Sequence, residues 1–233
     1  QIVHDVCLQN LPVCILSDHV GLVGDDGKTH HGVLSVPMLM SIPNLTLLAP
    51  RDTRQIRQAV RATLKLDGPC VVQYPKEGIE PYAQNVTGEP FAVGKWQTLI
   101  PGGQDAVILA YGRMTQNAIQ ASELLVQRGL SVGVIDCCSL KPLDMDCLRA
   151  LFERKAKIVT IEEGEMIGGF GSEIARVCVE ENADAPIQII GLENRFITHG
   201  SVPELLEECG LMPRQLADRI EKIVDNKEKS HVG

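Results

Sequence analysis

The residues best suited to chemistry lie together in the segment SDHVGLVGDDGKTHHG, at positions 17–32. Its sixteen residues include four glycines, three aspartates and three histidines. Histidine titrates near neutral pH and can exchange protons or bind anions, and carboxylates can orient hydroxyl groups. The pattern predicts either a loop that binds substrate and moves protons or an exposed polar loop. A calcium loop is disfavoured, because the D-x-D-x-D-G series ending in Glu is missing.

A second group of candidates lies in the last third of the chain. The run GGFGS at 168–172 could form a phosphate cradle, or it could allow close helix packing or a subunit contact. Because it lacks the full G-x-G-x-x-G spacing, helix packing or a subunit contact is favoured. Glu162 and Glu163 precede it and are interpreted as solvated or helix-capping groups in preference to an acid–base pair. Trp96 and Phe170 are interpreted as packing anchors.

The elements that position the segment 17–32 form a strand–helix–strand pattern. Buried strands are predicted at 11–17, 45–50 and 68–75. Between the last two lies a helix of apolar period, with Asp52 as its N-cap. This pattern is the unit of a parallel sheet, so the segment 17–32 should lie at the carboxyl edge of that sheet, where α/β proteins bind ligands.

The alternation of predicted strands and helices stops at residues 76–93 and resumes after them. Further strands are predicted at 105–112, 130–137, 157–163 and 186–192, alternating with helices. The sequence thus predicts an α/β chain of three parts: a partial parallel-sheet domain at 1–80, a linker at 81–93 and an open α/β domain at 94–233. The first part has only three strands and one clear helix, which predicts that more chain lies upstream.

Composition narrows the function classes. The formal net charge is −8, which disfavours a nucleic-acid surface. No apolar run is long enough for a membrane span, and the N-terminus lacks the features of a signal peptide. The eight cysteines form no C-x-x-C pair, so buried free thiols are favoured over zinc or disulfides, and a cytoplasmic location is expected.

Three stretches together resemble the 1-deoxy-D-xylulose-5-phosphate synthase family of the transketolase superfamily. They are GDDGKTHHG with PMLMSIPNLTLLAPRD, then DGPCVVQYPKEG, and then LKPLD, TIEEGEMIGGFGSEI and GLENRFITHGSVPELLEECGL. The resemblance covers nearly the whole chain in the family's order. It implies the second half of a pyrimidine-binding domain followed by a transketolase C-terminal domain, which chiefly supports dimer assembly, so a homodimer is expected.

The resemblance also implies a reaction. In that family thiamine diphosphate, held with Mg²⁺, decarboxylates pyruvate and adds the resulting two-carbon unit to glyceraldehyde 3-phosphate. His30 matches the active-site histidine, and Asp26 matches an aspartate that holds the aldehyde. On the residues alone, Asp26 could also be a turn former before Gly27, but the substrate role is favoured.

The chain departs from the family pattern at the positions associated with substrate phosphate. Two arginines of the family motif fall on His19 and Gln73, whereas Lys76 matches the next basic position and His31 replaces a glutamine. Arginine suits phosphate through its fixed, charged fork, which glutamine lacks. Phosphate could therefore be held differently, the aldehyde could differ, or the chain could be a relative with weakened activity.

The family's anchors for magnesium, the diphosphate and the aminopyrimidine lie upstream of residue 1, and GDDG at 24–27 does not match them. We therefore expect a missing N-terminal region or subunit, no tight thiamine diphosphate binding by the chain alone, and an inactive fragment. Two alternatives stay open: the small subunit of a split transketolase-like enzyme, and a non-catalytic assembly module derived from the family.

Overall fold

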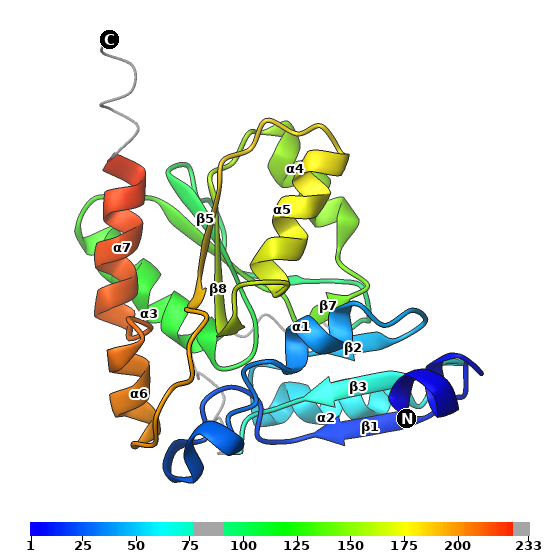
Figure 1. The fold of residues 1–233 in the computed structure, drawn as a ribbon. Coiled ribbons are helices and arrows are strands. Elements are labelled where there is room, and N and C mark those ends of the chain that lie inside the picture. Colours follow the sequence, from blue (N-terminus) through cyan, green and yellow to red (C-terminus); the bar gives the residue numbers. More distant parts are fainter. Residues whose placement is uncertain (77–90, 226–233) are drawn as a thin grey trace.

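A computed structural model describes residues 1–76 and 91–225, which fold into two α/β parts, each built on one sheet (Figure 1). The fold class predicted from the sequence is confirmed, since strands and helices alternate in both parts. The linker expected at 81–93 lies mostly outside the described residues.

The first sheet has the order β1-β3-β2-β7. Its predicted strands are β1 (Cys14–Ser17), β2 (Thr46–Leu48) and β3 (Cys70–Gln73), and they run parallel. The fourth strand, β7 (Ser139–Lys141), comes from the second half of the chain and pairs antiparallel with β2. The second half thus closes one edge of this sheet, while β1 remains at the other edge.

Helical segments surround the first sheet. They are η1 (Ile2–Cys7), a single turn of π-helix; η2 (Gly24–Thr29), a 3₁₀ segment; α1 (Ser35–Met40); and α2 (Thr53–Thr63). The side chain of Asp52 accepts a hydrogen bond from the backbone N–H of Gln55 at 2.7 Å, which confirms the predicted N-cap of α2.

The second sheet has the order β4-β6-β5-β8-β9. Its strands are β4 (Gln97–Ile100), β5 (Ala106–Ala110), β6 (Val132–Asp136), β8 (Ile158–Glu165) and β9 (Ile187–Leu192). All pairs are parallel except β4 with β6. The sequence predicted four of these strands and missed β4, because a short, half-exposed edge strand has no long apolar run.

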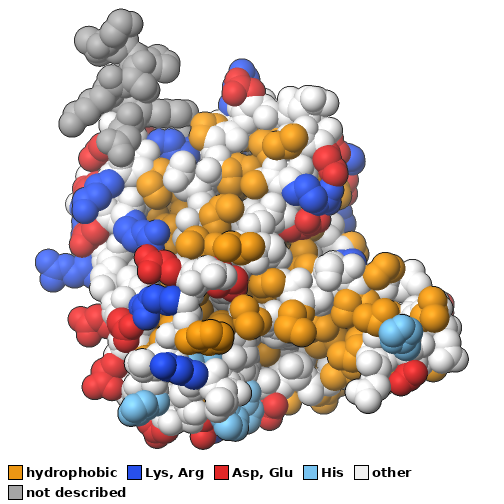
Figure 2. All heavy atoms as spheres, in the orientation of Figure 1, with side chains coloured by type: hydrophobic (Ala, Val, Ile, Leu, Met, Phe, Trp, Pro, Cys, Tyr) orange, Lys and Arg blue, Asp and Glu red, His pale blue; other side chains and the backbone are white. Residues whose placement is uncertain are grey.

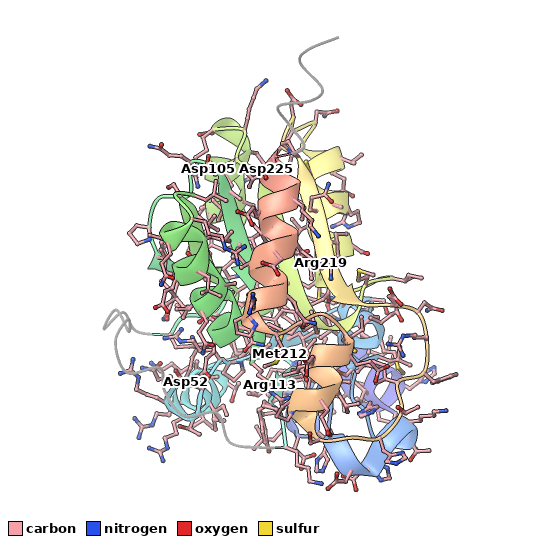
Figure 3. The ribbon with its side chains drawn as sticks, turned by 90° about the vertical axis from the view of Figure 1, so that its left-hand side faces the viewer. Asp52, Asp105, Arg113, Met212, Arg219 and Asp225 are labelled. Carbon is pink, nitrogen blue, oxygen red and sulfur yellow. The ribbon has the colours of Figure 1, made fainter. Side chains whose placement is uncertain are left out.

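Helices cover both faces of the second sheet. Figures 1 and 3 show α3 (Met114–Gln127) and α7 (Pro213–Asp225) on one face, and Figure 1 shows α4 (Met145–Glu153) and α5 (Phe170–Glu180) on the other. A short helix, α6 (Val202–Glu208), precedes α7 and begins with a capping box formed by Ser201 and Glu204. That S-x-x-E signal could have revealed α6 from the sequence.

The two sheets share an apolar core. Phe170 is fully buried and meets Trp96 and Tyr111 edge to face, with ring centroids 6.0 and 5.6 Å apart. The interpretation of Trp96 and Phe170 as packing anchors is therefore confirmed. A polar contact joins the same parts, because the buried Arg51 guanidinium pairs with the fully buried Asp136 at the end of β6.

One edge of the first sheet carries exposed apolar side chains. Leu8, Leu11, Val13 and Leu16 are between 37% and 74% exposed, on and just before strand β1. Figure 2 shows apolar side chains gathered over the region of β1 and η1. An edge strand with this composition is typical of a surface that another polypeptide covers.

Candidate active site

The segment 17–32 leaves β1 and folds back over the carboxyl ends of the first sheet. The backbone N–H of Val20 donates to the carbonyl of Tyr74 at 3.3 Å, and the N–H of Gly32 donates to the carbonyl of Gly21 at 2.8 Å. A Cβ atom on Gly32 would lie 2.2 Å from the carbonyl oxygen of His19. Only glycine fits this crossing, so the loop geometry depends on that residue.

The loop also packs against the second half of the chain. A Cβ atom on Gly24 would lie 3.3 Å from the carbonyl oxygen of Gly200, and one on Gly27 would lie 3.2 Å from Cβ of His199. Gly27 has φ 69° and ψ −154°, a conformation that breaks η2 and that glycine adopts without strain. The GDDG run is thus a tight, contact-rich turn between the two sheets.

Asp26 and Lys76 form an ion pair within this arrangement. Lys76 Nζ lies 2.6 Å from Asp26 Oδ2, and the two side chains are 46% and 36% exposed. The hydrogen bond and charge of Lys76 lower the pKa of Asp26, with smaller contributions from His30 and His19. The structure therefore brings together four residues that the sequence singled out and leaves them accessible to a ligand.

The two adjacent histidines have different surroundings. His30 is exposed at the end of η2, and its Nδ1 lies 2.9 Å from the Thr29 hydroxyl. The Nδ1 of His31 accepts from the N–H of Val23 at 3.1 Å, and its Nε2 lies 3.0 Å from the carbonyl oxygen of Thr198. This pattern fits a neutral His31 with its proton on Nε2. His31 thus ties the loop to the second half, whereas His30 projects from it.

The two positions that depart from the family motif also differ. His19 has φ 57°, and its Nδ1 lies 3.1 Å from a carboxylate oxygen of Asp18. Gln73, the last residue of β3, is 2% exposed. His19 therefore borders the accessible group formed by Asp26, Lys76 and His30, while Gln73 lies beneath that group.

Glu163 links the loop to the second sheet. Its Oε1 accepts from the backbone N–H of Leu22 at 2.8 Å and lies 3.1 Å from Nη1 of Arg113. Glu163 is 8% exposed, so its interpretation as a solvated or helix-capping group is wrong. Sequence reasoning missed this pair. The one available signal was that Arg113 directly follows the end of a predicted strand.

Glu162 belongs to β8 and is fully buried, with its carboxylate at the start of α5. Its two carboxylate oxygens accept from the N–H groups of Phe170 and Gly171, each at 2.9 Å. The helix-capping interpretation is confirmed and the solvated one is wrong. Burial raises the pKa of Glu162 to about 7, although the two N–H donors oppose this shift.

The glycines of the run 168–172 permit close packing. A Cβ atom on Gly171 would lie 2.4 Å from the hydroxyl oxygen of Thr160, and one on Gly169 would lie 2.3 Å from the carbonyl oxygen of Glu165. The packing interpretation of this run is confirmed. The N–H groups that a phosphate cradle would use are instead engaged by Glu162.

An apolar surface extends beside the loop. A hollow of about 180 Å³ is lined by Leu34, Leu192 and Phe196, among others. Phe196 is 79% exposed. Met38 on α1 and Ile167, which follows β8, are each 67% exposed. We call Leu34, Met38, Ile167 and Phe196 the apolar surface. Its exposure is large for side chains of this kind.

Residues 1–76 and 91–225 offer neither a metal-ligand cluster nor a membrane-spanning helix. These residues contain no cluster of three or more His, Cys, Asp or Glu side chains placed to hold a metal ion. Among the same residues, the structure has no helix of the length and apolar character that a membrane span requires.

The fold and this site define a two-part α/β protein with an accessible ion pair of Asp26 and Lys76 beside the first sheet. Residues 1–80 match the family model of the transketolase pyrimidine-binding domain, and residues 94–216 match that of the transketolase C-terminal domain. The chain belongs to the transketolase family.

Curated relatives with similar sequences are 1-deoxy-D-xylulose-5-phosphate synthases. That of Geobacillus thermodenitrificans is 40% identical over 231 residues, which are 98% of this chain and 36% of the relative. That of Rippkaea orientalis is 36% identical over 235 residues, which are 100% of this chain and 37% of the relative. The chain therefore spans about a third of the length of the relatives it matches, and its resemblance to this family is confirmed.

Solved structures agree with the fold. A split-gene transketolase, described as an inactive beta4 tetramer, superposes with a TM-score of 0.85 at 29% identity, covering 96% of this chain and 71% of that one. A transketolase of Pichia stipitis superposes with a TM-score of 0.78 at 20% identity, covering 94% of this chain and 31% of that one.

Proposed function

We propose that this chain supplies the substrate side of a thiamine-diphosphate-dependent 1-deoxy-D-xylulose-5-phosphate synthase. The reaction would decarboxylate pyruvate and join the remaining two-carbon unit to the aldehyde of glyceraldehyde 3-phosphate. The observation that carries the proposal is the accessible ion pair of Asp26 and Lys76, with His30 adding to the field at Asp26, at the carboxyl edge of the first sheet. The sequence similarity to the curated synthases supports the same reaction.

Each group has a role that its surroundings support. His30, which is exposed and has its Nδ1 beside the Thr29 hydroxyl, transfers a proton to or from the substrate hydroxyl. Asp26 accepts a hydrogen bond from a hydroxyl of the aldehyde substrate, and Lys76 keeps that carboxylate ionised while supplying one positive charge toward a phosphate.

His19 and His31 complete the proposed substrate side. His19 borders the accessible group and can offer a second positive charge only when it is protonated. His31 positions the loop through its two ring nitrogens, and this contact keeps the neighbouring His30 directed outward.

Thiamine diphosphate is the cofactor that the family uses, and it would supply the electron sink for decarboxylation. GDDG at 24–27 does not match the family's motif for the magnesium–diphosphate group, and its Asp26 is already paired with Lys76, so these residues do not fit that group. We therefore assign its anchors to another polypeptide region and derive no step through it. The exposed apolar edge at β1 is the surface on which that region would pack.

We also propose that two copies associate through the apolar surface. Its four side chains come from loops and a helix of both parts, and large exposed apolar side chains are typical of a subunit interface. The chain of similar fold from a split-gene transketolase is a tetramer, which supports self-association.

A second candidate function is the small subunit of a split transketolase-like enzyme. The observation that favours it is the structural match to a split-gene transketolase, of which this chain covers 71%. A non-catalytic assembly module is the third, favoured by His19 and Gln73 at two motif positions.

The test is carbon dioxide release from pyruvate by this chain combined with the polypeptide that carries the cofactor anchors. With thiamine diphosphate and Mg²⁺, we expect release that glyceraldehyde 3-phosphate stimulates. A His30→Ala variant should lower the stimulated rate by about 10²-fold or more, the usual contribution of a proton-transfer group. A His4→Ala variant, altered at an exposed histidine of η1, is the matched control. Absence of release in the unaltered protein would instead favour the assembly module.

A further inference from the structure

A small cavity lies at the carboxyl end of β3, beneath the loop 17–32. It has a volume of about 20 Å³ and is lined by Val20, Gly21, Gln73, Arg113 and Glu163, among others. This volume is enough for one water-sized group, such as a single hydroxyl.

Gln73 is the unusual member of this lining. Its side chain is buried, and within the described part of the chain neither its amide nitrogen nor its amide oxygen has a hydrogen-bond partner. An unpaired amide in a protein interior costs free energy, so such groups are rare in folded proteins. An amide that borders a cavity can offer both a donor and an acceptor to whatever enters it.

The charges around the cavity argue against an anion. Arg113 lies 3.1 Å from Glu163, and the two side chains are 11% and 8% exposed. This pair brings no net charge to the lining, and a phosphate would have to displace the Glu163 carboxylate from Arg113. A neutral group that both donates and accepts a hydrogen bond fits the lining without that penalty.

We propose that Gln73 and this cavity form a subsite for a hydroxyl group of the aldehyde substrate. The inference rests on the proposed function and deepens it, because it names the substrate as a hydroxyaldehyde recognised partly by a neutral amide. The hydroxyl would form one hydrogen bond with this amide, either accepting from the amide nitrogen of Gln73 or donating to its amide oxygen.

The location of the cavity supports a substrate group over an internal water. Val20 and Gly21 of its lining belong to the same loop that carries Asp26 and His30. Lys76, the partner of Asp26, follows Gln73 by three residues. The subsite thus adjoins the accessible group at the sheet edge where α/β proteins bind ligands.

The first experiment uses binding and requires no catalysis. The ¹⁵N-labelled chain is titrated with sn-glycerol 3-phosphate and, separately, with 3-hydroxypropyl phosphate, which lacks only the central hydroxyl. The side-chain amide signals of Gln73 are identified by their loss in a Gln73→Met variant. We expect these signals to shift with the first compound and to stay in place with the second. Equal responses, or none, would overturn the inference.

The second experiment measures discrimination in the assembled enzyme. The ratio of kcat/KM for glyceraldehyde 3-phosphate to that for its 2-deoxy analogue should fall about tenfold in Gln73→Met, the value of one hydrogen bond to a buried group. Gln127→Met, altered at an exposed position of α3, should leave the ratio unchanged. Aldehyde-independent carbon dioxide release should be the same in Gln127→Met and in the unaltered protein.

Thermal unfolding separates a substrate subsite from a water site. If the amide is unpaired until substrate binds, Gln73→Met should unfold at the same or a higher temperature than the unaltered chain. A lower unfolding temperature with unchanged discrimination would mean that Gln73 holds a structural water, and the inference would be wrong. Absence of pyruvate decarboxylation would instead count against the proposed function. The titration of the labelled chain would then decide the subsite independently.

Discussion

Glu162 gives the clearest quantitative prediction, because its carboxyl group is buried at the start of α5. Its pKa in the folded protein is about 7, against an ordinary value of 4.5. The folded state therefore binds this proton more tightly than the unfolded state does. By linkage, the free energy of unfolding must fall as the pH rises through the interval between these two values.

The magnitude follows from the same interval. Each pKa unit corresponds to about 1.4 kcal/mol, so ionising Glu162 should cost about 3 kcal/mol of stability between pH 4.5 and pH 8. A Glu162→Gln variant keeps one oxygen to accept a backbone N–H and carries no charge at any of these pH values. It should lose this part of the pH dependence, and the difference between the two proteins should change by about 3 kcal/mol across the range.

The assay is urea unfolding at several pH values, followed by the fluorescence of Trp96, the chain's one tryptophan. Other titrating groups are common to both proteins and cancel in the difference. Glu153→Gln, altered at an exposed position at the end of α4, is the matched control and should show no such change. A pH dependence identical in Glu162→Gln and the unaltered chain would refute the reasoning, because Glu162 would then ionise without cost.

Three further predictions concern packing and assembly. Arg51→Met should lower the free energy of unfolding by about 3–5 kcal/mol, measured in urea, because it leaves the buried Asp136 carboxylate without its ion-pair partner. Gly171→Ala should lower the free energy of unfolding by about 1–3 kcal/mol in the same assay, since its Cβ would lie 2.4 Å from a threonine hydroxyl of β8. An unchanged urea midpoint would mean that α5 shifts freely. Phe196→Asp should weaken self-association in sedimentation velocity, whereas Val126→Asp on the exposed face of α3 should not. Equal dimer fractions in the two variants would mean that the apolar surface is not the interface.

Much of the fold could be predicted from the sequence, because the information was local. Buried parallel strands have short β-branched runs, as in the segment around β5, and helices begin at caps such as Asp52. The strands that were missed, β4 and β7, lacked such signals. Strand β7 spans three residues and exists because β2 offers a free edge, a partner ninety residues away in the chain.

The candidate site divides in the same way. The residues of the loop 17–32 were found because histidines, aspartates and glycines in one short segment suggest chemistry without reference to distant contacts. Their arrangement was not predictable, since Lys76 reaches Asp26 across fifty positions of sequence and His31 binds the carbonyl of Thr198.

The sequence by itself determined the α/β class, the parallel strands and the loop with its family motif, because residue type and periodicity fix which segments become buried. Only the tertiary structure decided that Glu163 holds this loop, that Glu162 caps a helix in the interior, and that Gln73 lines a cavity with its amide unpaired within the described residues. The reason is that burial, pKa and hydrogen bonding depend on the groups that folding brings near, and those groups come from distant parts of the chain.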